Sequence, residues 1–204
     1  MKHPTISLIE RRVSANHFDA SFTLTNAEIE RLVDLATRAP TAYNFQNWRF
    51  VAVRGTQSKE RLRALAYGQT KVTDAGVTFI VCGVLPHHEV LRERLRPFVE
   101  AGFMSAVTAA GWREAARQAY ADEQKARDEA VRSAALGAAT LIYAAEAMDL
   151  ATSPIGGFDT AGVARAFGLA PNELPVLIVA VGRPACGNWP QKPRRPVSEV
   201  LEIA

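Results

Sequence analysis

The sequence predicts a single layered domain that mixes helices and strands, of the α+β or α/β class. Two nearly continuous apolar runs, 77–85 and 176–181, are typical of strands buried on both faces of a sheet. Segments with apolar residues at helical spacing flank these runs and predict helices that cover the sheet. The 204 residues can bury a sizeable core, and we expect one domain over 1–204. The order of the strands is left open by the sequence.

The first quarter of the chain carries clear local signals. Residues 5–12 predict a short amphipathic helix. Thr25 and Glu28 have the spacing of a capping box, and the helix that follows them is expected to stop before Pro40. Residues 48–53 then predict a strand.

The middle of the chain predicts mostly helix. Ser58 is expected to cap a helix that runs toward Tyr67. Residues 87–120 are interpreted as helical, with breaks near Pro97 and Gly102 because these residue types interrupt helices.

One long helix is expected over 122–148, charged at first and then rich in alanine. Because its second half is apolar all round, we expect it to be buried on every side, in so small a chain by a partner subunit. Asp159 or Thr160 is expected to cap a further helix through Phe167. Several prolines near the end predict an extended tail over about 183–204 that wraps a neighbouring subunit.

Composition and charge narrow the function classes. The chain has 24 Lys and Arg against 21 Asp and Glu, and no dense basic run with interleaved aromatics, so no nucleic-acid partner is expected. The uncharged stretch 133–145 is far shorter than the roughly 20 residues of a membrane span, so no membrane partner is expected. Cys82 and Cys186 form no CxxC motif, and the N-terminus lacks the apolar core of a secretory signal, which favours reduced thiols and a cytoplasmic location.

Most standard catalytic motifs are absent from the sequence. There is no phosphate-binding GxxxxGK[ST] loop, no GxGxxG after a strand, no GxSxG and no HExxH. His87 and His88 lack nearby metal-binding partners, so the start of a solvated helix is preferred over a metal site. Cys82 lies in a buried run, so an inert thiol is preferred over a nucleophile.

Four short segments differ from plain scaffold: 12–16, 39–48, 153–158 and 192–196. The first and last carry basic side chains, the second is rich in amides and hydroxyls, and the third contains paired glycines that let a backbone N–H approach a ligand. Taken alone, each fits a helix end, a turn or a solvated tail. Together they predict a site for a large, planar, polar ligand that bears an anion.

The four segments resemble the nitroreductase family of FMN-dependent oxidoreductases. That family has an Arg-x-Ser-x-Arg/Lys signature followed by Phe, a Pro-Ser/Thr-x-x-Asn-x-Gln-x-Trp segment, a Pro-x-x-Gly-Phe-Asp segment and a C-terminal Lys-x-Arg. The matching residues are Arg12, Ser14, Asn16 and Phe18; Pro40, Thr41, Asn44, Gln46 and Trp48; Pro154, Gly157, Phe158 and Asp159; and Lys192 and Arg194. The resemblance covers about residues 6–200, most loosely in the middle third, and stretch 68–71 is similar to that of compact NAD(P)H nitroreductases.

The resemblance implies a homodimer of three-layer αβα sandwiches with two FMN sites at the subunit interface. It places Arg12, Arg194 and Lys192 at the FMN phosphate, with Ser14 as a neutral donor. The ring is expected to meet Lys71 or Gln69 near N1 and O2, and a backbone N–H of Gly156 or Gly157 at N5, while the segment around Asn44 comes from the other subunit. The full set implied around FMN is Arg12, Val13, Ser14, Asn16, Pro40, Thr41, Ala42, Asn44, Gln46, Gln69, Lys71, Pro154, Ile155, Gly156, Gly157, Lys192 and Arg194.

The reaction that the resemblance implies is a ping-pong transfer. NAD(P)H gives hydride to flavin N5 and leaves, and a flat small-molecule acceptor, a nitroaromatic or a quinone, is then reduced. No catalytic side chain is needed, because the cofactor supplies the chemistry. Tyr43, Phe103 and Trp112 are candidates for the substrate channel, with core packing as the alternative. Reduction of a small enal or semialdehyde, and a flavin-binding redox sensor without turnover, are the rival interpretations.

One position departs from the family signature. Asn16 is neutral where the signature has Arg or Lys, so one cation is missing beside the ring or the phosphate. We expect the bound flavin to have a lower reduction potential than it would with a cation there.

Overall fold

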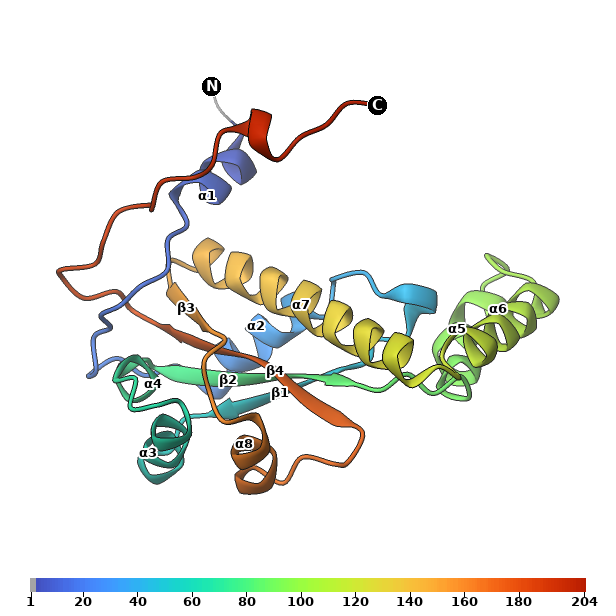
Figure 1. The fold of residues 1–204 in the computed structure, drawn as a ribbon, viewed down its shortest axis with the longest axis horizontal. Helices are drawn as coiled ribbons and strands as arrows, with labels where there is room; N and C mark the ends of the chain where they lie inside the picture. Colours follow the sequence, from blue (N-terminus) through green and yellow to red (C-terminus); the bar gives the residue numbers. More distant parts are fainter. Residues whose placement is uncertain (1–2) are drawn as a thin grey trace.

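A four-stranded antiparallel sheet forms the middle layer of the protein (Figure 1). The computed structural model describes residues 3–204. The strands are β1 (Trp48–Val53), β2 (Val77–Val84), β3 (Ala151–Ile155) and β4 (Glu173–Gly182), in the order β1-β2-β4-β3. The strand pair β2 and β4 is central, which agrees with the two apolar runs in the sequence.

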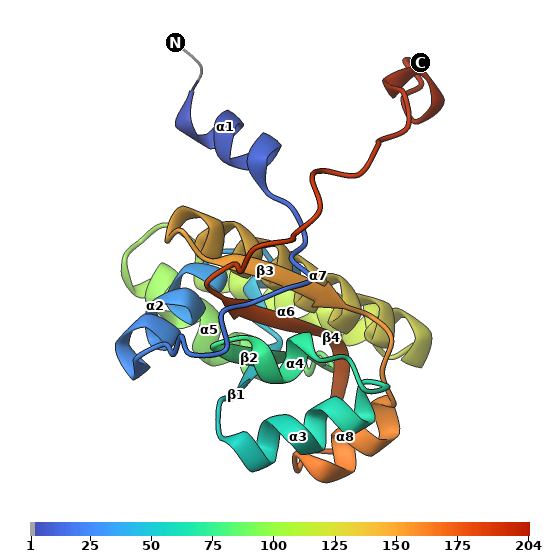
Figure 2. The ribbon, with the colours of Figure 1, turned by 90° about the vertical axis from the view of Figure 1, so that its left-hand side faces the viewer.

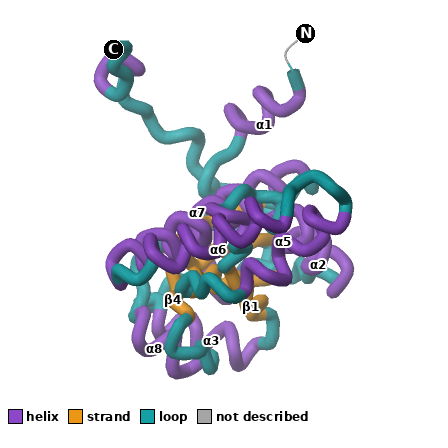
Figure 3. The backbone as a smooth tube through the Cα atoms, turned by 90° about the vertical axis from the view of Figure 1, so that its right-hand side faces the viewer, coloured by secondary structure: helices purple, strands orange, loops and turns teal. Residues whose placement is uncertain are grey.

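Helices cover both faces of this sheet. The helices of the described residues are α1 (Pro4–Arg11), α2 (Asn26–Ala36), α3 (Thr56–Leu65), α4 (Lys71–Asp74), α5 (Val90–Glu100), α6 (Ala106–Ala119), α7 (Glu123–Ala147) and α8 (Thr160–Ala166), with short 3-10 turns at Ala42–Asn44 and Val197–Glu199. One face carries α2 and α7, and the other carries α3, α4 and α8 (Figures 1 and 2). Figure 3 shows the strands between the two helical layers. The three-layer αβα sandwich is confirmed.

Alternation along β2 explains why both faces are covered. Val77, Phe79 and Val81 join the core beneath α2 and α7, whereas Ile80 and Cys82 join the core beneath α3 and α8. All five side chains are fully buried. A strand that is apolar on both sides therefore needs a helical layer on each side.

Local signals set several element boundaries as expected. Thr25 and Glu28 form a complete capping box at the start of α2, with the Thr25 N–H donating to Glu28 Oε2 at 2.7 Å. Asp122 and Asp159 accept hydrogen bonds from backbone N–H groups at the starts of α7 and α8. β1 spans Trp48–Val53, the range predicted from the sequence.

Two expectations about the elements are wrong. Helix α3 begins at Thr56 after Gly55, so Ser58 lies inside the helix and does not cap it. Helix α5 continues through Pro97 to Glu100, although it does end before Gly102, whose φ is +76°. The hydrogen bond that Pro97 cannot make falls on the exposed side of the helix, where water can replace it.

Strand β3 was not predicted, because five residues that include Ser153 and Pro154 carry little strand signal. β3 is an edge strand, the place in a sheet where proline is tolerated. The second half of α7 is not buried on every side of this chain: Leu136 and Tyr143 are 40% and 38% exposed.

The two ends of the chain extend from the same side of the body (Figure 2). Helix α1 is tied to α7 by Arg11, whose Nε lies 2.9 Å from Glu146 Oε1. Residues 183–204 run along the body and then away from it, and most are exposed. Within 3–204, no helix is both long and apolar enough to cross a bilayer.

Candidate functional site

The segment after α1 is fixed beside the edge strand of the sheet. Arg12 directly follows the helix, and its NH1 donates to Ser14 Oγ at 3.4 Å. Ser14 pairs with Thr152 of β3 in a parallel bridge, and the Ala15 N–H donates to the Thr152 carbonyl oxygen at 2.8 Å. These contacts position the Arg12 guanidinium and the Ser14 hydroxyl together.

The tail brings two more cations to this place. Gln191 Nε2 donates to the Arg12 carbonyl oxygen at 3.2 Å, and Arg194 NH2 donates to Gln191 Oε1 at 2.8 Å. Arg194 NH1 also donates to the Lys192 carbonyl oxygen at 3.2 Å. The Lys192 ammonium lies 5.6 Å from the centre of the Trp189 ring. A series of hydrogen bonds thus links Arg12, near the start of the polypeptide, to Gln191 and Arg194 in the tail.

Lys71, at the start of α4, completes the cationic cluster of Arg12, Lys71, Lys192 and Arg194. Burial lowers the pKa of Lys71, and the positive charge of Lys192 lowers this pKa further. Across residues 3–204, none of the four cations forms an ion pair with a carboxylate. Gathered cations without acidic partners favour the binding of an anion.

The paired glycines leave their backbone open to a ligand. Gly156 and Gly157 follow β3 and are exposed, and a Cβ added to either would meet no atom within 4 Å. Neither has a positive φ, so backbone conformation does not demand glycine here. Gln69 Nε2 donates to the Gly157 carbonyl oxygen at 3.2 Å and thereby joins the loop before α4 to these glycines.

The second polar segment is strained and internally bonded. Tyr43, Asn44 and Gln46 have φ values of +50°, +59° and +49°, in the left-handed region that non-glycine residues seldom adopt. The Gln46 N–H donates to Thr41 Oγ1 at 3.0 Å, and Gln46 Nε2 donates to Asn44 Oδ1 at 3.2 Å. Strain held in this way is common at ligand-binding sites.

An apolar cavity of about 380 Å³ adjoins that segment. The residues that line it are Pro40, Thr41, Tyr43, Asn44, Leu95, Phe98, Met104 and Trp112. The rings of Tyr43 and Trp112 meet edge to face at 5.8 Å between centroids. Phe103 does not line this cavity: its side chain is 80% exposed, and its ring packs on Phe98 at 5.8 Å.

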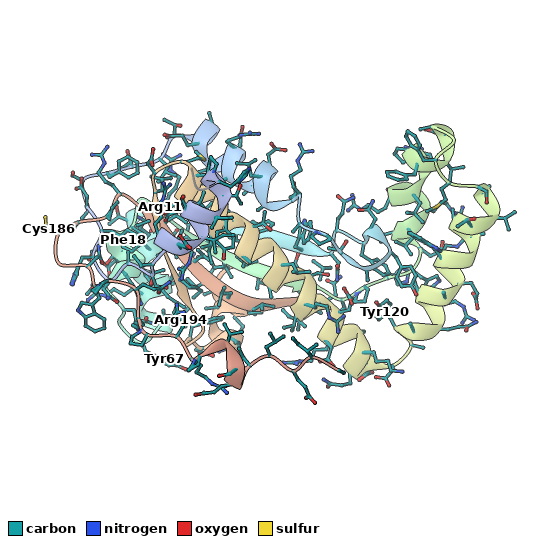
Figure 4. All side chains as sticks on the ribbon, turned by 90° about the horizontal axis from the view of Figure 1, so that it is seen from above. Arg11, Phe18, Tyr67, Tyr120, Cys186 and Arg194 are labelled. Atoms are coloured by element: carbon teal, nitrogen blue, oxygen red, sulfur yellow. The ribbon has the colours of Figure 1, made fainter. Side chains whose placement is uncertain are left out.

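The two groups of site residues lie in different parts of the molecule. Arg194 lies in the tail, whereas Tyr120, whose ring is 6.4 Å from that of Tyr43, lies toward α5 and α6 (Figure 4). No hydrogen bond or ring contact within the described part joins residues 12–16 to residues 40–46. One chain therefore presents two separate half-sites.

Sequence reasoning missed two residues that organise the cationic cluster. Asn188 Oδ1 accepts hydrogen bonds from the N–H groups of Asn16 at 2.6 Å and His17 at 2.9 Å, so it braces the turn after Ser14. Gln191 bridges Arg12 and Arg194. The Gly-Asn pair before Trp189 is a turn signal, but no local pattern could assign its distant partners.

The two adjacent histidines lie just before α5. His88 Nε2 lies 3.2 Å from Glu89 Oε1, and its ring centre lies 4.9 Å from that of His87. No group of three or more His, Cys, Asp or Glu residues in 3–204 is arranged to hold a metal ion.

Comparison with known proteins identifies the family of this chain. The sequence model of the Nitroreductase family matches residues 9–183. The Bacillus subtilis protein YodC, provisionally named an NAD(P)H nitroreductase, is 30% identical over 196 residues, which cover 96% of both chains. The NADH dehydrogenase of Thermus thermophilus is 30% identical over 182 residues, with coverage of 85% of this chain and 83% of that protein.

Solved structures share the whole fold. The nitroreductase-like protein smu.346 of Streptococcus mutans has a TM-score of 0.87 and 26% identity, and the match covers 98% of this chain and 97% of that one. An Exiguobacterium sibiricum protein solved in complex with FMN has a TM-score of 0.89 and 23% identity, with coverage of 100% and 99%. With the family match spanning most of its length, this chain belongs to the nitroreductase family.

Proposed function

We propose that the protein is an FMN-dependent NAD(P)H oxidoreductase that reduces a flat electron acceptor, a nitroaromatic or a quinone, and that it acts as a homodimer. The observation that carries the proposal is the cationic cluster, which lacks acidic partners within residues 3–204. Gln69, two residues before Lys71, links the start of α4 to the open backbone of Gly156 and Gly157. Family membership and the FMN-bound structure of the Exiguobacterium relative support it.

The residues present fit the phosphate of FMN. This phosphate is close to dianionic at neutral pH, and the Arg12 and Arg194 guanidinium groups offer planar pairs of N–H donors that match its oxygens. Ser14 adds a neutral donor, which Arg12 already holds in place at 3.4 Å. Lys192 adds charge from the tail.

The residues also fit an isoalloxazine ring. With no side chain over them, Gly156 and Gly157 can each offer a backbone N–H to a ring edge. Lys71 is half-buried, and both burial and the charge of Lys192 disfavour its protonated form. An anionic ring edge beside the ammonium group would stabilise that protonated form. Gln69 holds the Gly157 peptide and leaves the open side of the backbone free.

The half-site of residues 40–46 suits a ligand that is bound by a second subunit. No hydrogen bond or ring contact among residues 3–204 joins it to residues 12–16, and Tyr120, which packs on Tyr43, lies well apart from Arg194 (Figure 4). In the proposed homodimer, Thr41, Asn44 and Gln46 of one subunit would hold the ring edge and ribityl chain of the ligand bound by the other. The exposed stripe on α7, with Leu136 and Tyr143, supplies an apolar surface for such contact.

When bound, FMN supplies two-electron transfer between NAD(P)H and the acceptor, so no side-chain acid or base is required. The protein orients both partners and excludes water. Tyr43 and Trp112 form aromatic walls of an apolar cavity, which suits a flat acceptor. Charged or strongly hydrated acceptors are disfavoured there.

Visible spectroscopy of the purified protein tests the proposal. Flavin absorption bands that bleach anaerobically with NADPH or NADH, and return with a quinone, are expected. The rate with each donor gives the donor preference. A yellow protein that neither donor bleaches would contradict the oxidoreductase function, and a colourless protein that takes up no added FMN would contradict the cofactor.

A further inference from the structure

A second cavity of about 380 Å³ lies between α5 and α6, outside the sites described above. Its apolar wall consists of Leu91, Leu95, Val99, Ala106, Ala109 and Ala110. These side chains are all aliphatic, and none offers a hydrogen bond or an aromatic face. The wall therefore complements a hydrocarbon chain and not a purine or nicotinamide ring, which would leave its polar edges without partners.

The rim of this cavity is cationic. Arg92, Arg96 and Arg113 border it, against a single carboxylate, that of Glu100. Arg96 Nε lies 3.8 Å from Glu100 Oε1, beyond hydrogen-bond distance. Arg113 is half-buried and, among residues 3–204, forms no ion pair or hydrogen bond. A guanidinium without a partner at the mouth of an aliphatic cavity is a ready site for a carboxylate.

We infer that the cavity between α5 and α6 binds an aliphatic carboxylate of medium chain length. The carboxylate pairs with Arg113, with Arg92 and Arg96 beside it, and the hydrocarbon chain lies along the wall of leucine, valine and alanine. A cavity of this size is within the usual range for small-molecule sites. Charge complementarity and the absence of polar groups on the wall together select an amphipathic anion over a simple anion or a neutral apolar molecule.

Leu95 connects this site to the proposed acceptor cavity. Its side chain is 3% exposed and lines both cavities, with Tyr43 and Trp112 on one side and Ala109 and Ala110 on the other. A ligand seated against Leu95 thus contacts a wall of the acceptor cavity. Binding is expected to change the fluorescence of Trp112, a signal that Trp112→Phe would remove.

Titration calorimetry with decanoate on the purified, flavin-containing protein tests the inference. Saturable binding of one decanoate per chain is expected, with affinity rising about threefold to fourfold for each added methylene from hexanoate to decanoate. Neutral decanamide and short acetate are expected to bind at least about tenfold more weakly. Arg113→Gln should weaken decanoate about tenfold, and Ala110→Leu should weaken it by filling the cavity.

The matched control is Arg94→Gln, which removes an arginine from the same helix pair but away from the cavity lining. It should change decanoate affinity less than about twofold. Equal weakening by both arginine substitutions would mean general electrostatic attraction and would overturn the site. Equal binding of acetate and decanoate would overturn the hydrocarbon part, and release of FMN by decanoate would place the ligand in the cofactor site. None of these results depends on whether the protein reduces quinones.

Discussion

The side-chain amide of Gln69 donates a hydrogen bond to the carbonyl oxygen of Gly157, with 3.2 Å between Nε2 and O. The same nitrogen donates to the carbonyl oxygen of Ala66 at 3.1 Å. One side chain therefore fixes the glycine loop after β3 relative to the end of α3. Of the residues assigned to the ring end of the proposed cofactor site, Gln69 has a clear structural role before any ligand binds.

Replacing Gln69 with leucine is expected to weaken FMN binding about fivefold, because loss of a hydrogen bond of about 1 kcal/mol leaves the Gly157 peptide without its anchor. Quenching of FMN fluorescence on titration with flavin-free protein measures this affinity. Gln124→Leu, on the exposed face of α7, is the matched control and should have no effect. Equal affinities for the wild-type and Gln69→Leu proteins would contradict this role.

The Lys71 side chain is expected to lower the stability of the flavin-free protein and to increase the affinity of the protein for FMN. Burial and the nearby charge of Lys192 lower its pKa from 10.5. The folded chain thus holds this proton less tightly than the unfolded chain, so the stability of the flavin-free protein rises with pH between the lowered pKa and 10.5. Lys71→Met should remove this rise and raise the melting temperature at neutral pH.

The same substitution should reduce FMN affinity, roughly tenfold, because it removes a cation from the site. Thermal melting with and without FMN separates the two effects. A variant that is both less stable without FMN and unchanged in affinity would assign Lys71 a structural role only.

β2 and α7 approach each other closely at Gly83. A Cβ at this position would overlap the backbone carbonyl of Ala130, which cannot move without displacing the helix. Gly83→Ala is expected to destabilise the fold by about 2 kcal/mol or more, measured by urea unfolding. Gly111→Ala is the control: it meets no atom within 4 Å and should stabilise α6 by about 0.5–1 kcal/mol.

The two cysteines should differ sharply in reactivity. Burial, with a further contribution from the Glu173 carboxylate, raises the pKa of Cys82 to about 12, whereas Cys186 is exposed in the tail. Titration of the native protein with a chromogenic disulfide reagent should detect Cys186 alone, and both thiols should react after denaturation. Cys186→Ser should abolish the native reaction, and a fast reaction at Cys82 would contradict its burial.

Asn16→Lys should raise the reduction potential of the bound flavin, because a cation near the ring or phosphate favours the reduced, more negative cofactor. The Asn16 N–H is held by Asn188 at 2.6 Å, so the substitution changes the side chain without removing the backbone bond. A spectroelectrochemical titration compares the two proteins. An unchanged or lower potential would reject the hypothesis.

Local signals made much of the fold predictable. The capping box of Thr25 and Glu28 and the continuous apolar run of β2 lie within a few residues of sequence, so the sequence displays them directly. The prediction for β3 failed because its pairing with β4, not its composition, makes it a strand. Pro97 was misjudged because the exposure of its side of α5 is a tertiary property.

The site could be predicted as a set of residues but not as an arrangement. The family resemblance grouped Arg12, Ser14 and Arg194, but the bridge through Gln191 joins Arg12 to a residue 179 positions away. Likewise, no pattern in the sequence shows that Leu95 separates two cavities. Contacts of that length depend on how the layers pack.

Because Arg194 and Asn44 belong to separate half-sites, two inactive alleles that each carry one of these changes should complement each other in the proposed homodimer. A mixed dimer of Arg194→Gln and Asn44→Ala chains has one doubly defective site and one wholly intact site. Random assortment in a cell that expresses both alleles equally should restore about a quarter of wild-type turnover. Because the half-sites are separate, the activity of a cell depends on which two alleles it carries together, and two alleles that are each inactive alone can yield an active dimer.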